Sequence, residues 1–349
     1  MWLKTNWYKL LSVLIILYVL IFGILTPLKT GISSIEKDSF KSGTSIDFVV
    51  NGYNSHYMSS RYYQVWLKFD NKHVVKGLVL NRISEQEMQI GFDIPQDLPF
   101  ESGSGFATLV QFSPKDGPSI LPSKLYFEET PLDSTQTYAN WSDERIQIRK
   151  HEKGFKFPYR NILNETIRNT FFHVAIWFAM FFLMILSMIQ SILYLKKKDI
   201  IHDIKAYSFA QIAIIFGFVG LATGSMWAKY TWGTYWTSDV KLNMTAIAIL
   251  IYCAYWVLRG SIKDIDSKAR ISAAYNIFAF LMLIPLIFVI PRMTDSLHPG
   301  NGGNPALGGE DLDNTLRAIF YPAIIGYSML GYWISTLFIR LGIVAEEES

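Results

Sequence analysis

Six long runs of apolar residues divide this chain, and they restrict what it can fold into more than any other feature. Each run is about as long as a helix that crosses the hydrocarbon core of a bilayer, which takes about 20 residues. The last five contain no Asp, Glu, Lys, Arg or His. The runs cover residues 10–25, 174–195, 206–226, 242–258, 271–290 and 318–339. We therefore expect an all-α membrane protein built as a six-helix transmembrane bundle.

The first run, residues 10–25, is interpreted as a retained helix rather than a cleaved signal peptide. It is long for such a signal, and the following Thr26-Pro27-Leu28-Lys29 offers no small-x-small cleavage site. The short links at 196–205 and 259–270 are rich in Lys and Arg, which is typical of cytoplasmic loops. We therefore expect both termini in the cytoplasm, and residues 30–160, 224–242 and 291–317 on the opposite side of the membrane.

Residues 30–160 differ in character, because short alternating segments are divided by turn residues such as Asn51-Gly52. Alternation at a period of two, with turns at this spacing, is typical of a small antiparallel β-sandwich. The segments are 45–50, 63–69, 74–80, 88–94, 106–112 and 124–127. The predicted order is a transmembrane helix at 1–29, an inserted extracytoplasmic β-sandwich domain at 30–160 and a five-helix transmembrane domain at 161–349.

Charge and cysteine content exclude several classes of function. The net charge of +3 is too small to indicate nucleic acid as a partner, and the basic residues gather at helix ends. The single cysteine, Cys253, excludes internal disulfides, Cys-based zinc sites and haem attachment through Cys-x-x-Cys-His. His56, His73 and His151 are far apart with no ligand-like spacing, so we interpret them as solvated surface residues.

The aromatic segment, residues 224–242, is expected as an extracytoplasmic loop of the five-helix domain, and it contains more rings than a membrane interface requires. Amphipathic rings at such an interface form an aromatic belt, but a belt needs only one or two rings at a helix end. This segment has Gly233 between two rings, and its aromatic residues are Trp227, Tyr230, Trp232, Tyr235 and Trp236. A large π surface with a Gly for close backbone approach favours a flat apolar ligand, and a porphyrin is the obvious candidate.

Two histidines flank the aromatic segment and are expected at the same membrane face. His173 begins the second apolar run, and His298 follows the fifth. A bis-histidine haem needs a ligand on each side of the porphyrin, apolar walls and cations for the propionates. His173 and His298 are therefore the candidate iron ligands, with Tyr230 as a weaker one. The candidate propionate contacts are Lys229, Lys241, Arg292 and Arg317. Asp239 is expected to orient Lys241 or to accept a hydrogen bond from an indole N–H.

The segments 223–228 and 232–242 read Thr-Gly-Ser-Met-Trp-Ala and Trp-Gly-Thr-Tyr-Trp-Thr-Ser-Asp-Val-Lys-Leu. They resemble the tryptophan-rich, WWD-type signature of the haem-handling proteins of cytochrome c biogenesis and, within that group, the CcmC family. This family has six helices, with one axial histidine before the signature and one after it. His173 and His298 match those positions and by resemblance inherit the axial-ligand role. Trp227, Trp232, Gly233, Trp236 and Asp239 inherit haem contact. Tyr235 and Lys241 stand where Trp and Arg are common and are kept as candidate contacts.

The resemblance implies a haem-binding and delivery protein of the bacterial inner membrane, not an enzyme. Such a protein holds non-covalent, b-type haem at the periplasmic face and passes it to a CcmE-like periplasmic haem chaperone. The other implied partners are a small CcmD-like membrane subunit, CcmA-like and CcmB-like ABC-transporter subunits and membrane lipid. The β-domain departs from the family, whose first external loop is normally short. We hypothesise that it docks the chaperone or another assembly partner.

Three other interpretations remain open. A CcsA-like haem lyase or translocase would resemble this chain around the signature but would use further histidines inside its helices. We expect no helical histidine here, with His202 in a cytoplasmic loop. A b-type cytochrome carrying electrons across the bilayer would need haem ligands at two depths. The last alternative is an aromatic-belted membrane protein whose β-domain is the functional part.

Overall fold

The computed structural model describes residues 2–131, 139–142, 146, 154–298 and 312–348. The chain forms two compact units, one made of Met1–Thr26 and Thr166–Ser349 and the other of Pro27–Glu165. We refer to them as the helical unit and the β-unit. The β-unit extends a few residues beyond both of the domain boundaries that we expected from the sequence.

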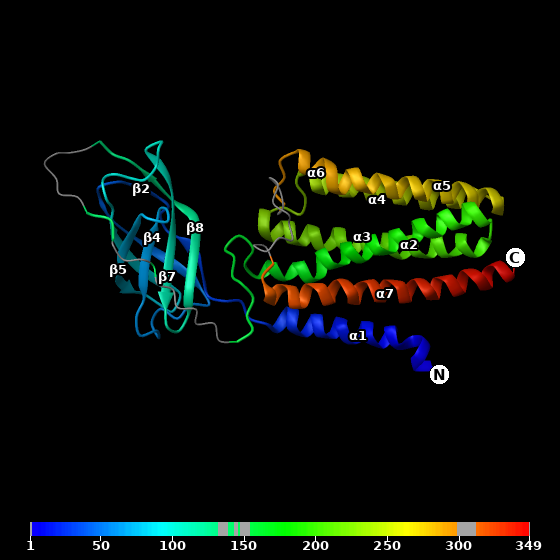
Figure 1. Cartoon of the computed structure of the whole chain (residues 1–349), viewed down its shortest axis with the longest axis horizontal. Coiled ribbons are helices and arrows are strands. Elements are labelled where there is room, and N and C mark those ends of the chain that lie inside the picture. The colour runs from blue at the N-terminus through cyan, green and yellow to red at the C-terminus, as the bar shows by residue number, and fades with distance from the viewer. Residues whose placement is uncertain (1, 132–138, 143–145, 147–153, 299–311, 349) are drawn as a thin grey trace. The chain divides into compact units, whose positions relative to one another are not determined.

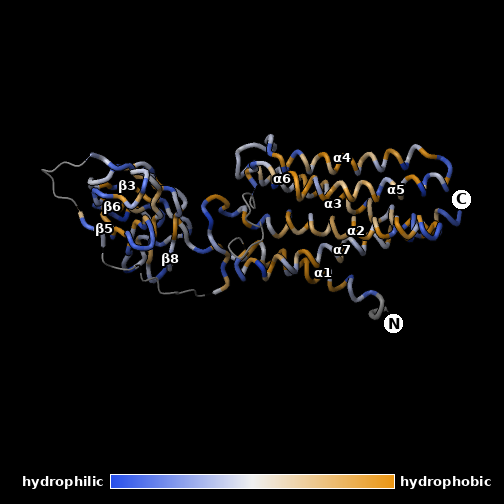
Figure 2. The backbone as a smooth tube through the Cα atoms, turned by 45° about the horizontal axis from the view of Figure 1, so that its top comes forward, coloured by the Kyte–Doolittle hydropathy of each residue, from blue (hydrophilic) through white to orange (hydrophobic). Residues whose placement is uncertain are grey.

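The helical unit contains the membrane-spanning part of the chain. Among the described residues, six helical segments are long and apolar enough to cross a membrane, and Figure 2 shows the hydrophobic colour along them. The helices are α1 (Trp2–Leu25), α2 (Ala175–Lys197), α3 (Ile200–Trp232), α4 (Val240–Ser261), α5 (Ile265–Leu283), α6 (Ile290–Met293) and α7 (Asn314–Glu347). Shorter turns precede α2 and α6: η1 (Asn164–Arg168), η2 (Thr170–Val174) and η3 (Ile284–Val289). The prediction of a multi-pass protein with six spanning helices is therefore confirmed.

Aspartates begin four of these helices. The side chains of Asp199, Asp239, Asp264 and Asp313 each accept a hydrogen bond from a backbone N–H in the first turn, at the start of α3, α4, α5 and α7. An N-terminal carboxylate satisfies a donor that the helix leaves unpaired and interacts favourably with the helix dipole. The caps define where each helix begins, and only residues 198–199 connect α2 to α3 and residues 262–264 connect α4 to α5.

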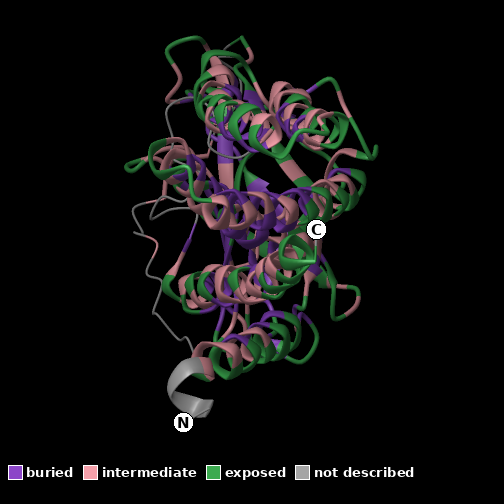
Figure 3. Ribbon diagram, turned by 90° about the vertical axis from the view of Figure 1, so that its right-hand side faces the viewer, coloured by how far each residue is buried: buried purple, intermediate pink, exposed green. Residues whose placement is uncertain are grey.

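Helix α2 lies at the centre of the bundle. It packs against α3, α5 and α7, while α1 packs against α7 and α4 packs against α5, as Figure 1 shows for the helices lying side by side. Small residues allow close approach: a Cβ added at Gly326 of α7 would lie 2.8 Å from Ile15 Cγ2 of α1. Apolar side chains of α2 to α5, including Leu183, Ile212 and Tyr252, form the bundle core, and burial concentrates there in Figure 3.

The β-unit is one curled sheet rather than the predicted sandwich of two sheets. Its strands are β1 (Gly31–Ile35), β2 (Ser39–Lys41), β3 (Ser45–Tyr53), β4 (Gln64–Lys68), β5 (Val74–Arg82), β6 (Glu87–Asp93), β7 (Ser104–Ser113) and β8 (Gly117–Glu128). Within the described chain they form an eight-stranded sheet in the order β1-β3-β6-β5-β4-β7-β8-β2. Strand β5 joins the two halves, because its first residues pair with β4 and its later residues with β6.

The core of the β-unit lies inside this curl. Alternate residues of β3, β6, β7 and β8 point inward, and buried members include Val50, Ile90, Leu109 and Phe127. Each of the six predicted strand segments overlaps an observed strand, from β3 to β8. Strands β1 and β2 were not predicted, because they are short and carry little alternation.

Two sequence predictions about α3 are wrong. The aromatic segment was expected as a loop over 224–242, but α3 continues as helix to Trp232, so only residues 233–239 connect it to α4. Gly233 ends the helix with a φ of 82°, a left-handed conformation that glycine adopts without strain. His202, expected in a loop, lies in the first turn of α3, where its Nδ1 is 2.7 Å from Gln190 Oε1.

Candidate functional site

The last turns of α3 and the first turn of α4 meet the segment that follows α6. Trp227 and Trp232 extend from α3, Asp239 begins α4, and His298 lies five residues beyond the end of α6 at Met293. The ring centroids of Trp227 and Trp232 are 4.9 Å apart in an edge-to-face arrangement. Three parts of the sequence therefore converge at one end of the bundle.

The carboxylate of Asp239 connects these parts. It accepts hydrogen bonds from the backbone N–H groups of Lys241 at 2.9 Å and Leu297 at 2.7 Å, and from His298 Nδ1 at 3.1 Å. Its side chain is 1% exposed. Burial acts to raise the pKa of Asp239, but the hydrogen bonds from Leu297 N–H and the Ser296 hydroxyl outweigh it, so the pKa lies below its ordinary value. The group is therefore a buried carboxylate that holds the His298 segment against α4.

The imidazole of His298 lies against the two indoles. Its ring centroid is 4.8 Å from that of Trp232 and 5.7 Å from that of Trp227. Because Nδ1–H donates to Asp239, the lone pair of Nε2 is available for a metal, an arrangement common among metal-binding histidines. Burial lowers the pKa of His298, and the Asp239 charge offsets only part of this effect. The imidazole is therefore neutral at pH 7, which is the form that ligates iron.

His173 lies in the π-helical turn η2, just before α2. Its Nδ1 is 2.9 Å from the carbonyl oxygen of Gly220 and 3.1 Å from Thr223 Oγ1, both on α3. The Thr223 hydroxyl itself donates to α3 carbonyls, so its oxygen accepts from Nδ1–H and Nε2 of His173 keeps its lone pair. Turns of this π type recur at functional sites.

Two glycines of α3 make room for neighbouring rings, Gly224 for His173 and Gly220 for Trp177. A Cβ added at Gly224 would lie 2.5 Å from His173 Cε1, and a Cβ added at Gly220 would lie 2.7 Å from Cε2 of Trp177. Both distances are shorter than real contacts of that kind, so any larger residue would displace a ring. A small-xxx-small pattern permits close helix packing in membranes, and the spacing from Gly220 to Gly224 is therefore a sequence signal that could have indicated this contact.

The two histidines occupy the same end of the bundle. His173 contacts α3 at Gly224, and His298 contacts the same helix at Trp227. Within the described ranges, no group of three or more His, Cys, Asp or Glu residues could hold a metal ion. Two imidazoles alone are a poor site for a bare ion. They match an iron that brings its own equatorial ligands, as haem iron does.

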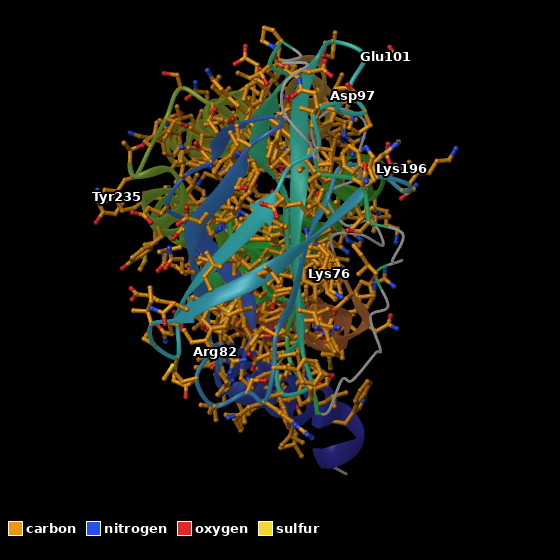
Figure 4. All side chains as sticks on the ribbon, turned by 90° about the vertical axis from the view of Figure 1, so that its left-hand side faces the viewer. Lys76, Arg82, Asp97, Glu101, Lys196 and Tyr235 are labelled. Atoms are coloured by element: carbon orange, nitrogen blue, oxygen red, sulfur yellow. The ribbon has the colours of Figure 1, made fainter. Side chains whose placement is uncertain are left out.

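Part of the aromatic segment is exposed. Tyr230, Tyr235 and Trp236 are 78%, 61% and 43% exposed, and Figure 4 shows Tyr235 projecting outward. The indole Nε1 of Trp236 donates to Asn243 Oδ1 at 3.3 Å. We expected an indole to donate to Asp239. Among the bonds described above, the ring that donates to Asp239 is instead the imidazole of His298. Asp239 also contacts Lys241 through the backbone N–H of that residue.

Two of the four predicted propionate contacts, Lys241 and Arg292, are linked electrostatically. Lys241 interacts electrostatically with both His298 and Arg292. Lys229 instead donates to the Gly233 carbonyl at 2.9 Å and lies 5.5 Å from the Tyr235 ring centroid. Arg317 lies in the first turn of α7, where it donates to Asn314 Oδ1 at 3.5 Å. Lys241 is therefore the predicted cation that acts directly on His298, and Arg292 acts on Lys241.

A buried ion pair lies in the two links that we predicted to be cytoplasmic loops. Arg259 Nη1 of α4 donates to Asp203 Oδ1 of α3 at 2.7 Å, and Nη2 donates to the other carboxylate oxygen. Only 12% of the Arg259 side chain and 4% of the Asp203 side chain are exposed. Both residues fall within the links at 196–205 and 259–270 that were predicted as cytoplasmic loops. Their pairing instead joins α3 to α4 at the end of the bundle opposite the histidines.

Comparison with known proteins shows that the second half of this chain is similar to proteins named heme exporter protein C. The family model described as CcmC, heme exporter protein C, matches residues 155–349. The heme exporter protein C of Bradyrhizobium diazoefficiens is 29% identical over 170 residues, which cover 47% of this chain and 62% of that protein. That of Paracoccus denitrificans is 22% identical over 187 residues, covering 54% of this chain and 76% of the relative. That of Escherichia coli K12 is 24% identical over 133 residues, covering 38% and 52%. The chain thus spans less than two thirds of the length of the Bradyrhizobium and Escherichia proteins.

Proposed function

Because this chain belongs to the CcmC family of heme exporter proteins, we propose that it binds haem between His173 and His298 and delivers it to an acceptor protein. Membership in this family connects the chain to haem handling in cytochrome c biogenesis. The finer parts of the proposal are the axial ligands, the face of the membrane and the acceptor. The axial ligands rest on the residues described above, the face of the membrane on the basic links between the helices, and the acceptor on the family resemblance.

One observation carries the proposal: two imidazoles at the same end of the bundle each have Nδ1 held by an acceptor. The acceptor is the Gly220 carbonyl for His173 and the Asp239 carboxylate for His298. Such partners fix the tautomer and the ring orientation, which leaves Nε2 as the metal-binding atom in both rings. A pair of this kind supports non-covalent, b-type haem with two axial histidines.

The surrounding side chains match the rest of a haem. Trp227 and Trp232 supply an apolar wall beside His298. Lys241 and Arg292 supply cations for the propionates, with Lys241 as a point charge and Arg292 as a planar donor. Tyr235 and Trp236, which are exposed, would cover the outer face of the porphyrin or meet the acceptor.

Delivery requires that bound haem can leave. A site at the end of the bundle is open to a partner in water, whereas a site in the middle of the membrane would not be. We place this end on the periplasmic side of a bacterial inner membrane, with both termini in the cytoplasm. The proposed acceptor is a periplasmic haem chaperone, and the β-unit, inserted just before His173 in the chain, would dock it or another assembly partner.

The test is the absorbance spectrum of protein purified from haem-replete cells. The wild type should show a b-type spectrum, with haem that acid and organic solvent extract. His173→Ala and His298→Ala should each lose most of this haem. His202→Ala is the matched control, because this helical imidazole also has a hydrogen-bonded Nδ1 but lies at the opposite end of α3. Equal haem content in all four proteins would overturn the assignment of the ligands.

A further inference from the structure

The β-unit contains another imidazole held by a buried carboxylate. His56 Nδ1 is 2.7 Å from Asp116 Oδ1, the backbone N–H of His56 donates to Oδ2 at 2.9 Å, and the Tyr63 hydroxyl donates to the same carboxylate. The Asp116 side chain is 2% exposed, whereas the His56 side chain is 41% exposed. His56 was expected as an ordinary solvated residue, but this side chain is anchored.

The anchoring leaves one ring nitrogen of His56 free. A buried carboxylate only accepts hydrogen bonds, so Nδ1 carries the proton and Nε2 carries a lone pair. Nε2 lies across Cε1 from Nδ1, so the hydrogen bond to Asp116 does not involve it. This is the same arrangement as in His298 with Asp239, and it prepares an imidazole to bind a metal.

The segment around His56, residues 54–63, is held in place by many bonds. Tyr57 is 1% exposed and its hydroxyl donates to Gln111 Oε1 at 3.0 Å. The Ser55 hydroxyl and the Tyr57 N–H both bond to the Glu85 carbonyl. Ser60 N–H bonds back to the His56 carbonyl at 2.9 Å. The imidazole is therefore presented from a rigid support, so little conformational entropy would be lost on binding a ligand.

The surface beside His56 suits a molecule that is apolar in its body and anionic at its edge. Met58 and Tyr62 of the same segment are 54% and 44% exposed. Lys115 Nζ donates to the Ser59 hydroxyl at 2.8 Å, and Arg82 Nη1 donates to the Ser60 carbonyl at 2.7 Å. Exposed apolar side chains and two cations thus border the segment that carries the imidazole.

We propose that His56 is a further axial ligand for haem iron, in a second haem-binding site on the β-unit. The inference rests on the proposed function, in that haem is the molecule handled. A bare metal ion would need several protein ligands, and no cluster of three or more donors occurs in the part of the chain described here. Haem needs one imidazole, an apolar surface for the ring and cations for the propionates. A single protein ligand also leaves the second axial position of the iron open to a ligand from an acceptor.

The other anchored histidine of the β-unit lacks this setting. His73 Nδ1 is 2.7 Å from Asp70 Oδ2, but the Asp70 side chain is 43% exposed, so water competes for that hydrogen bond. The His73 ring also packs against Trp141, with centroids 4.9 Å apart. His73 is therefore a matched control. His151, the third histidine considered in this part of the chain, lies outside the described residues.

The test titrates ferric haem into purified, full-length protein in detergent and follows the absorbance and electron paramagnetic resonance spectra. Iron with two imidazoles is low-spin, and iron with one imidazole is high-spin. The wild type should bind two haems per chain, one of each kind. His56→Asn should remove the high-spin component, and His73→Asn should not. Asn is chosen because its amide can still donate to Asp116, which preserves the support. Asp116→Asn should weaken high-spin binding roughly 10- to 100-fold.

The outcomes separate this inference from the proposed function. The double variant His173→Ala with His298→Ala should lose the low-spin signal and keep the high-spin signal. If the low-spin signal is absent from the wild type while His56→Asn still removes a high-spin signal, the bis-histidine site is wrong and the His56 site stands. If the wild type binds no high-spin haem, or His56→Asn binds it as tightly as the wild type, the His56 site is wrong.

Discussion

The hydrogen bonds of Asp239 allow a sharp test of how the site is assembled. This carboxylate accepts from Lys241 N–H, Leu297 N–H and His298 Nδ1 and is almost fully buried. Asp239→Asn keeps the size of the side chain and, since Asn caps helices as well as Asp does, keeps the start of α4. It removes the negative charge that orients His298, and its amide N–H₂ cannot accept from Leu297.

The expected effect is a loss of haem affinity with little loss of helix. A hydrogen bond to a charged group contributes about 1.5–3 kcal/mol. Removing the partner of a metal-ligating histidine typically costs about 10- to 100-fold in affinity, and at about 1.36 kcal/mol for each factor of ten this is about 1.4–2.7 kcal/mol. The two estimates agree. We therefore expect the dissociation constant for haem at the low-spin site to rise about 10- to 100-fold in Asp239→Asn.

The assay is a haem titration of the detergent-purified protein, read from the low-spin absorbance, with helix content followed by circular dichroism. Asp264→Asn is the control, because Asp264 caps α5 by accepting from Ser267 N–H and the bonds described for it involve no histidine. Haem affinity should be unchanged in the control. If Asp239→Asn binds haem as tightly as the wild type, or if Asp264→Asn weakens binding equally, Asp239 does not act through His298.

Three further predictions address other parts of the helical unit. Gly224→Ala places a methyl 2.5 Å from His173 Cε1, so it should destabilise this packing by about 1–3 kcal/mol and reduce the amount of low-spin haem. The control is Gly260→Ala, whose methyl meets nothing within 4 Å and should have neither effect. Burial holds the pKa of His298 below about 6.5, so the low-spin spectrum should persist from pH 8 to about 6.5 and decline only on further acidification; a decline centred above pH 7 would contradict this. Asp203→Asn leaves the buried guanidinium of Arg259 without its carboxylate partner. The change should destabilise the fold by roughly 3–5 kcal/mol and lower the thermal unfolding midpoint. An unchanged midpoint would argue against a buried ion pair.

Features that depend on local pattern could be predicted from the sequence. The six spanning helices follow from apolar length, and the strands from β3 to β8 follow from alternation and turns. The convergence of His173 and His298 at one end of the bundle follows from counting helices between them. The signal that Gly233 ends α3 was also present, because glycine commonly follows the last helical residue, and recognising it would have limited the loop to residues 233–239.

Features that depend on contacts between distant residues could not be predicted. His56 and Asp116 are 60 positions apart, and no spacing rule relates them. Asp239 looks in sequence like a partner for Lys241 or an indole, but tertiary structure brings His298 to it. The pairing of Asp203 with Arg259 was hidden because charges beside apolar runs usually lie in water. A curled single sheet and a two-sheet sandwich also share the same alternation, since both bury one face of each strand.

The supports of the two proposed axial ligands differ in kind. His173 belongs to a helical turn, and its ring meets Gly224 and the Gly220 carbonyl of α3, whereas His298 lies beyond the end of α6, where Asp239 tethers both its ring and the neighbouring Leu297 N–H. Ligand exchange would therefore begin at His298. An acceptor that approaches from that side would take over one coordination bond while His173 still retains the iron, so haem would pass between proteins without being released into water.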